Sequence, residues 1–294
     1  MTSTPTFPRM PAAFIGHGSP MNTLEVNRFT AAWRELGRSL PRPRAVLAIS
    51  AHWFIGGSAV TAMARPRVIH DFYGFPQPLA DFDYPAPGAP DVAQEIAEVV
   101  RPQHLGLDQD SWGLDHGTWS VLAHVFPDAS IPVVQLSIYA GAPASYHIEL
   151  GAKLAPLRDR GVFILGSGNV VHNLRRLNPG LSDQAFDWGQ RFDAEVQRVM
   201  TTVPAELPDV MRHPDYALSA PTPEHFIPLL YLAGLCSAAG QPARAFAQGG
   251  VMGGITMTSF LLGGHCPSSA QANGDGTGGA LPDPAVVPPE QTNL

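Results

Sequence analysis

The chain has 294 residues, enough to bury the core of one large α/β domain or of two modest ones. Its 18 Lys and Arg against 25 Asp and Glu give a net charge of -7, and no basic run could follow a phosphate backbone, so we expect no nucleic-acid partner. Two cysteines exclude a disulfide framework, and the absence of a secretory signal and of any apolar stretch of ~18 residues predicts a cytoplasmic protein with no membrane partner.

Strand and helix signals alternate from the N-terminus onward. Residues 12–15 and 45–50 are apolar runs typical of strands buried on both faces, and the segment between them has helical spacing. This pattern predicts a βαβ unit with two parallel strands. Residues 65–90 are rich in proline and aromatic side chains, and we expect them to form a long ordered loop or lid.

The alternation of strands and helices continues to residue 262. The further expected elements are helices over 91–100, 118–126, 142–158, 187–200 and 223–235, and strands over 131–138, 162–165 and 251–262. The pattern predicts an α/β fold, a single domain with a mostly parallel central sheet flanked by helices. We place this domain at residues 11–265, after an N-terminal extension (1–10) and before a Pro/Gly-rich tail (266–294) that we expect to be disordered.

Three histidines follow three of the predicted strands. His17 and His52 each come directly after a short apolar run, and His172 follows a strand and the turn Gly166-Ser167-Gly168-Asn169. The carboxyl ends of parallel strands meet at one edge of a sheet, where ligand crevices open. Imidazole is neutral near pH 7 and is a common metal ligand. The sequence therefore predicts a metal site at the sheet edge.

Two more histidines, His116 and His225, lie in loops rich in glycine or proline. Their acidic neighbours Asp115 and Glu224 are candidates to hold a ligating imidazole by a hydrogen bond. The alternative for any single loop histidine is a surface or turn residue, and His116 beside Trp119 fits that description too. The remaining histidines are expected to be structural or exposed, with His70 in the aromatic loop as an intermediate case: His104, His124, His147, His213 and His265.

Several long motifs in fixed order make the chain resemble the class III extradiol ring-cleavage dioxygenases, most closely their 4,5-DOPA dioxygenase branch. The resemblance runs from about residue 10 to 262. The motifs that carry it are Gly16-His17-Gly18-Ser19-Pro20-Met21-Asn22, Ser50-Ala51-His52-Trp53-Phe54, Ile69-His70-Asp71-Phe72-Tyr73-Gly74-Phe75-Pro76, Tyr84-Pro85-Ala86-Pro87-Gly88, Trp112-Gly113-Leu114-Asp115-His116-Gly117-Thr118-Trp119, Gly168-Asn169-Val170-Val171-His172-Asn173 and Pro221-Thr222-Pro223-Glu224-His225.

The resemblance implies roles for the five loop histidines. His17, His52 and His225 match the family's metal-binding positions, and His172 matches an acid/base histidine that in this branch is also a metal ligand. His116 matches an active-site histidine that contacts substrate or dioxygen. The implied cofactor is one divalent metal ion, Fe(II) for activity, with Zn(II) able to occupy the same site.

One departure from the wider family concerns the last ligand. Other class III enzymes complete the metal site with a glutamate, whereas here Glu224 and His225 are adjacent. The sequence leaves open which of them faces the metal, and we favour His225.

The resemblance implies an oxidoreductase that opens the ring of a DOPA-like catechol with O2, inserting both oxygen atoms and giving a muconate semialdehyde. The expected partners are therefore a small catechol and dioxygen, with Arg175, Arg176 and Tyr216 as candidates to recognise the amino acid group; the sequence assigns no oligomeric state. Two alternatives stay open. A zinc-dependent hydrolase would use the same histidines to activate water, and a non-catalytic metal-binding protein would keep the fold alone.

Overall fold

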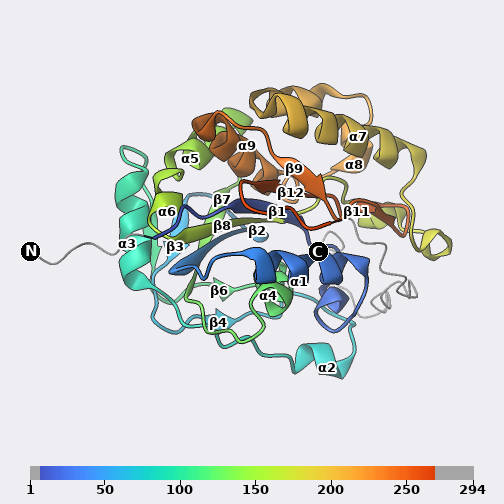
Figure 1. Ribbon diagram of the computed structural model, residues 1–294. Coiled ribbons are helices and arrows are strands. Elements are labelled where there is room, and N and C mark those ends of the chain that lie inside the picture. The colour runs from blue at the N-terminus through green and yellow to red at the C-terminus, as the bar shows by residue number, and fades with distance from the viewer. Residues whose placement is uncertain (1–6, 269–294) are drawn as a thin grey trace, which may run out of the picture.

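The centre of the molecule is an eight-stranded sheet, seen in a computed structural model that describes residues 7–268 (Figure 1). In spatial order its strands are β5 (Gly106–Asp108), β3 (Ala59–Thr61), β7 (Val133–Tyr139), β2 (Ala45–Ile55), β8 (Val162–Gly168), β1 (Ala12–Gly16), β12 (Ser259–Leu262) and β9 (Arg244–Phe246). The four central strands β7, β2, β8 and β1 are parallel, and β12 and β9 add antiparallel strands at one side. This confirms the predicted α/β fold with a mostly parallel sheet.

Helices cover both faces of the sheet (Figure 1). The helices α1 (Arg28–Ser39) and α4 (His116–Val125) lie on one face, and α5 (Ala144–Lys153), α7 (Asp187–Thr202) and α9 (Ile227–Ala239) lie on the other. The helix α3 (Pro90–Val99) packs against β3, β5 and β7. No helix among residues 7–268 is long and apolar enough to cross a membrane.

Short elements fill the connections between these layers. They are α2 (Gln77–Ala80), α6 (Pro156–Asp159), α8 (Tyr216–Ser219), the 3-10 helices η1 (Pro20–Thr23), η2 (Leu174–Arg176), η3 (Pro179–Leu181) and η4 (Pro204–Arg212), and two small sheets, β4 (Arg67–Val68) with β6 (Gly113–Leu114) and β10 (Gly250–Val251) with β11 (Ile255–Thr256). The segment 65–90, predicted as one long loop, thus contains a two-residue strand and a single helical turn. The rest of it is loop, as expected.

Local sequence explains the first helix. The Asn27 side chain accepts hydrogen bonds from the backbone N–H groups of Phe29 and Thr30, and the Thr30 hydroxyl accepts from the Asn27 N–H, which forms a reciprocal capping box. The apolar positions Phe29, Trp33 and Leu36 recur at helical spacing and are buried. This helix connects β1 to β2 and completes the predicted βαβ unit.

Two elements that were predicted to be continuous are interrupted in the structure. The strand expected over 251–262 is three short strands, because the left-handed Gly253 (φ 75°) turns the chain between β10 and β11. The helix expected over 142–158 is divided into α5 and α6, and Pro156, which has no N–H to donate, begins the second piece.

The predicted boundaries at the two chain ends are only partly within the described residues. Met10, assigned to the N-terminal extension, is fully buried, and its N–H donates to the carbonyl of Arg158 at 2.9 Å. Residues 1–6 and, for the predicted tail, 269–294 lie outside the described residues. The domain limits 11–265 stay a prediction.

A buried histidine lies between α5 and α9, on the helical face away from α1 and α4. His147 Nδ1 is 3.1 Å from the Tyr231 hydroxyl, and its Nε2 has no hydrogen-bond partner among residues 7–268. Burial lowers the pKa of His147 to about 4. The folded protein therefore holds this imidazole neutral over most of the pH range in which the unfolded chain protonates it.

We expect this histidine to make the metal-free protein acid-sensitive. Since its pKa is lower when folded, the stability is fully present above the unfolded value near 6.5 and is lost as pH falls toward 4. Urea unfolding of wild type and His147→Gln at pH 7.5 and pH 4.5 should show the difference in unfolding free energy move by roughly 2–3 kcal/mol, to the disadvantage of wild type at the lower pH. A difference that stays constant with pH would contradict the assignment.

Candidate metal centre

Five histidines from distant parts of the chain meet beside the carboxyl ends of the central strands. His17 follows β1 directly, and His116 is the first residue of α4. His172 follows β8 in a loop that bridges to Ile255, and His225 immediately precedes the turn into α9. The side chains are buried. The structure thus brings together all the histidines that the sequence singled out.

The position of His52 differs from the prediction. The strand β2 does not end at residue 50 but continues to Ile55, and its pairing with β7 shifts register between Ile49 and Phe54. Such an irregularity re-aims side chains locally. His52 therefore lies within an irregular strand rather than after its end, and still reaches the same edge of the sheet.

The imidazoles are in direct contact with one another. The Nε2 atoms of His17 and His52 are 3.3 Å apart. The ring centroids of His52 and His116 are 4.0 Å apart, and those of His17 and His225 are 5.3 Å apart. The rings of His172 and His225 are stacked, with centroids 3.5 Å apart and planes inclined by 10°.

The tautomer of His17 follows from a serine at the end of β8. The Ser167 hydroxyl donates its hydrogen to the carbonyl of Gly117, so its oxygen accepts from Nδ1 of His17 at 2.9 Å. Nδ1 then holds the proton, and the lone pair of Nε2 faces the other histidines. The carbonyl of His17 also accepts from the Asn22 side chain at 2.9 Å, which fixes the backbone here.

One carboxylate lies behind two of the rings. Asp71 Oδ1 accepts from the backbone N–H and from Nδ1 of His116, both at 3.0 Å. Asp71 Oδ2 is 3.2 Å from Nδ1 of His52. Burial alone would raise the pKa of Asp71, but the two imidazoles lower it well below its usual range. Sequence reasoning singled out the acids at 115 and 224 and missed this residue.

A second carboxylate lies behind His225. Glu224 Oε1 is 3.1 Å from Nδ1 of His225 and accepts from the Thr222 hydroxyl at 2.6 Å. Nε2 of His225 is buried and has no hydrogen-bond partner in the described part of the chain. Burial raises the pKa of Glu224, but the contacts with His225 and Thr222 outweigh it and lower the pKa.

Burial decides the charge of most of the cluster. Desolvation, followed by the neighbouring imidazoles, lowers the pKa of His17, His52 and His172 well below 6.5. Burial would also lower the pKa of His116, but the adjacent Asp71 carboxylate raises it overall. The first three rings are therefore neutral at neutral pH, the form in which an imidazole binds a metal ion.

The positions of these nitrogen and oxygen atoms suit the binding of a metal ion. Two groups have ligand atoms all within 4.8 Å of one another, one being His17, His52 and His116 and the other His172, Glu224 and His225. Neutral nitrogen lone pairs that face each other, with acceptors holding the opposite ring nitrogens, are stabilised by a cation between them. The residues present thus fit a divalent metal ion.

Asp115 does not hold an imidazole, so that candidate role is wrong. It caps the N-terminus of α4 by accepting from the Thr118 N–H at 3.1 Å, and it accepts from the Ser50 hydroxyl at 2.7 Å. Burial first, and then the charge of Asp71, raise the pKa of Asp115 to about 6. Its contribution is to start α4 at His116.

Aromatic side chains pack around His116. Phe72 packs edge-on against the His116 ring with centroids 5.6 Å apart, and it also contacts Phe75 and Trp119. His70 is exposed, contacts Phe72 and Trp119, and lies 2.8 Å through Nε2 from the carbonyl of Phe82. The loop expected as a lid therefore places an apolar wall beside the cluster.

The residues proposed to recognise an amino acid group have surroundings that differ from those of the five histidines. Arg175 and Arg176 lie exposed on η2, just after His172. Tyr216 packs against Phe192 and Phe226. Within residues 7–268, the histidines expected to be structural or exposed stay outside both ligand groups: His104, His124, His147, His213 and His265.

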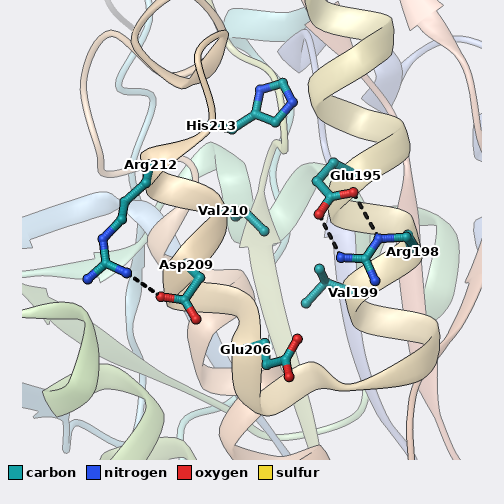
Figure 2. Close-up of a pocket in the computed structure, with 8 residues that line it drawn as sticks. All are labelled: Glu195, Arg198, Val199, Glu206, Asp209, Val210, Arg212 and His213. Carbon is teal, nitrogen blue, oxygen red and sulfur yellow. Dashed lines mark hydrogen bonds and ion pairs between the residues drawn. The ribbon is translucent and has the colours of Figure 1, made fainter.

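A pocket between α7 and η4 is a separate feature (Figure 2). Its lining is Glu195, Arg198, Val199, Glu206, Asp209, Val210, Arg212 and His213. Both of its arginines are paired within their own helices, Arg198 with Glu195 at 2.7 Å and Arg212 with Asp209 at 2.6 Å. The lining of this pocket includes no member of the histidine cluster.

Comparison with known proteins agrees with this geometry. Residues 11–254 match the family described as the catalytic LigB subunit of aromatic ring-opening dioxygenase. A 4,5-DOPA dioxygenase extradiol of Escherichia coli (strain K12) is 48% identical over 259 residues, 87% of this chain and 95% of the relative. A protein of the same name from Beta vulgaris is 37% identical over 243 residues, 79% of this chain and 88% of the relative. The crystal structure of an uncharacterized protein from Escherichia coli K12 superposes with a TM-score of 0.76 at 42% identity, covering 87% of this chain and all of that one.

Proposed function

Because this chain belongs to the family of the catalytic LigB subunit of aromatic ring-opening dioxygenases, metal-dependent oxidoreductases that act on an aromatic ring with O2, we propose that it opens a DOPA-like catechol beside one hydroxyl. The product would be a muconate semialdehyde. Both atoms of dioxygen enter that product, so the reaction balances without a separate reductant. The choice of catechol is supported by the two relatives named for 4,5-DOPA.

The observation that carries the proposal is the convergence of buried imidazole nitrogens. We assign the metal to Nε2 of His17, His52 and His225, the positions that match the family's metal-binding histidines. Each of these rings has an acceptor beside its Nδ1 atom, as His116 also has. The ion would be Fe(II) in the active enzyme, although Zn(II) suits the same nitrogen donors. When bound, it would gather catechol and dioxygen and make the catechol hydroxyls more acidic.

The adjacent Glu224 and His225 have different parts in this proposal. Glu224 Oε1 is already engaged by His225 Nδ1 and by the Thr222 hydroxyl. The buried Nε2 of His225 has no such engagement with residues 7–268. We therefore assign His225 as the ligand and Glu224 as the carboxylate that holds its ring.

Proton transfer is assigned to His172, assisted by His116. His172 is stacked on His225 and, in the described part of the chain, no side-chain hydrogen bond occupies its ring nitrogens. It can accept a proton from a catechol hydroxyl and return one later. His116 gives its Nδ1–H to Asp71, which leaves Nε2 for a substrate or oxygen atom. That His172 also binds the ion stays a prediction.

The aromatic loop supplies a surface for the substrate ring. Phe72 lies edge-on beside His116, and the fully buried Trp119 of α4 packs behind both rings and supports them. Offset or edge-to-face contacts of this kind suit another aromatic ring. With the limits set by the sequence, the catalytic domain would comprise residues 11–265.

Anaerobic loading with Fe(II), followed by air and a panel of catechols that includes DOPA, tests this function. We expect O2 uptake equal to the catechol consumed and a coloured semialdehyde whose mass is that of the catechol plus two oxygen atoms. Protein loaded with Zn(II) is the matched control and should consume no O2. Hydrolysis of an ester or amide without O2 uptake would favour the zinc hydrolase, and inactivity toward every catechol would overturn the proposal.

A further inference from the structure

Asp71 is the only residue of the cluster's surroundings, within residues 7–268, placed against two of the five imidazoles at once through Nδ1 contacts. It lies in the loop between β4 and α2, whereas His52 belongs to β2 and His116 begins α4. Its side chain thus connects three separate segments. By contrast, Ser167 faces only His17, and Glu224 faces only His225.

The two carboxylate oxygens are used differently. Oδ1 accepts two hydrogen bonds from His116, one from the backbone N–H and one from Nδ1, so the first residue of α4 is held by both its main chain and its ring. Oδ2 is buried and lies 3.2 Å from His52 Nδ1, but it accepts no hydrogen bond from residues 7–268, so this contact is a charge–imidazole approach rather than a formed hydrogen bond. An ionised carboxylate only accepts hydrogen bonds, so it favours the Nδ1–H tautomer in both rings: through the hydrogen bond from His116 and through its proximity to Nδ1 of His52.

This arrangement determines what the other ring nitrogens can do. With the proton on Nδ1, Nε2 of neutral His52 is a lone-pair donor that lies 3.3 Å from Nε2 of His17. The Asp71 carboxylate raises the pKa of His116, so Nε2 of that ring carries a lone pair only in the neutral form. If either ring took the other tautomer, a buried N–H would point into the cluster and a lone pair would face a carboxylate. Both changes are unfavourable in a site shielded from water.

We propose that Asp71 is a shared positioning residue, which fixes the orientation and tautomer of His52 and His116 together and so makes metal binding and substrate contact depend on one carboxylate. The roles of the two histidines in this inference rest on the proposed function, whereas their tautomers do not depend on it. The same loop carries Phe72, which packs on the His116 ring. The contacts that Asp71 makes with the two histidines therefore also hold Phe72 beside the His116 ring.

The Asp71→Asn variant keeps the shape of the side chain but removes its negative charge and one of its two accepting oxygens. An amide has one accepting oxygen and one donating nitrogen, so it can satisfy the Nδ1–H of only one ring. We expect Zn²⁺ affinity, measured by competition with a chromophoric chelator, to fall roughly 10- to 100-fold. Asp83→Asn, an exposed acid in the same proline-rich region, is the matched control and should bind Zn²⁺ like wild type.

The tautomers provide a readout that needs neither metal nor turnover. Long-range ¹H–¹⁵N spectra of the metal-free wild type, at a pH where the imidazoles are neutral, should show both His52 and His116 protonated on Nδ1. In Asp71→Asn at least one of the two should change tautomer. An Nε2–H form of either ring in wild type would overturn the inference even if the variant failed to fold.

The outcomes distinguish this inference from the proposed function. If wild type cleaves catechols but Asp71→Asn keeps both tautomers and its Zn²⁺ affinity, the shared positioning role is wrong and the function stands. If the tautomers and the affinity respond as expected while wild type opens no catechol, the function is wrong and the positioning role stands.

Discussion

His17→Ala should abolish both metal binding and ring cleavage. The Nε2 lone pair of His17 faces Nε2 of His52 at 3.3 Å, and the ring is held from behind by Ser167, so the substitution removes an oriented ligand. Loss of a residue that only hydrogen-bonds to a metal ligand lowers metal affinity roughly 10- to 100-fold. We expect loss of the ligand His17 itself to lower metal affinity by more than that. Metal content after dialysis, measured by elemental analysis, together with O2 uptake, checks this result.

A graded set of variants makes this prediction sharper. His225→Ala should behave like His17→Ala, whereas Glu224→Gln should keep the metal with affinity lower by roughly 10- to 100-fold. His104→Ala, at an exposed position away from the cluster, is the control and should load like wild type. Full metal content in His17→Ala would remove that residue from the ligand set, and a greater loss in Glu224→Gln than in His225→Ala would reverse the assignment of those two.

His172→Ala should lose turnover even in the fraction of the protein that holds Fe(II). The His172 ring is stacked on His225, and no side-chain hydrogen bond from the described residues occupies its ring nitrogens, whereas Nδ1 of the assisting His116 is held by Asp71. Loss of a general acid/base lowers kcat by roughly 100- to 10,000-fold. Stopped-flow absorbance with Fe(II)-loaded protein and a saturating catechol measures kcat directly.

Chemical rescue adds a second readout for the same variant. The substitution leaves space beside His225 for a free imidazole, and added imidazole should restore part of the lost kcat without changing iron content. Ring cleavage at the wild-type rate in iron-loaded His172→Ala would contradict the acid/base role. Loss of iron together with activity would instead support His172 as a metal ligand.

Much of the fold follows from short-range patterns in the sequence. Apolar runs such as 12–15 and 45–50 have no helical alternative of sufficient length, and the segment between them repeats its apolar residues at helical spacing and begins with a cap. The C-terminal strands were harder to predict because apolar residues continue through 251–262 while the turn depends on Gly253, whose left-handed backbone no hydrophobic pattern reveals.

The histidines could be found from the sequence because each follows a strand or lies in a glycine- or proline-rich loop. The groups that hold them could not. Asp71 is 19 residues from His52 and 45 from His116 along the chain, and Ser167 is 150 residues from His17. An acid next to His70 in a loop was a visible signal, but only the three-dimensional contacts select Asp71 over Asp115, which is adjacent to His116 and bonds elsewhere.

The order of strands in the sheet has a consequence for the synthesis of the protein. β1 comes first from the ribosome, yet it pairs only with β8 and β12, and β12 ends at residue 262. The strand that carries His17 at its end therefore has no partner until β8, which ends at residue 168, has been translated. A chain that stops before β12 would carry all five histidines but would lack one of the two strands that pair with β1.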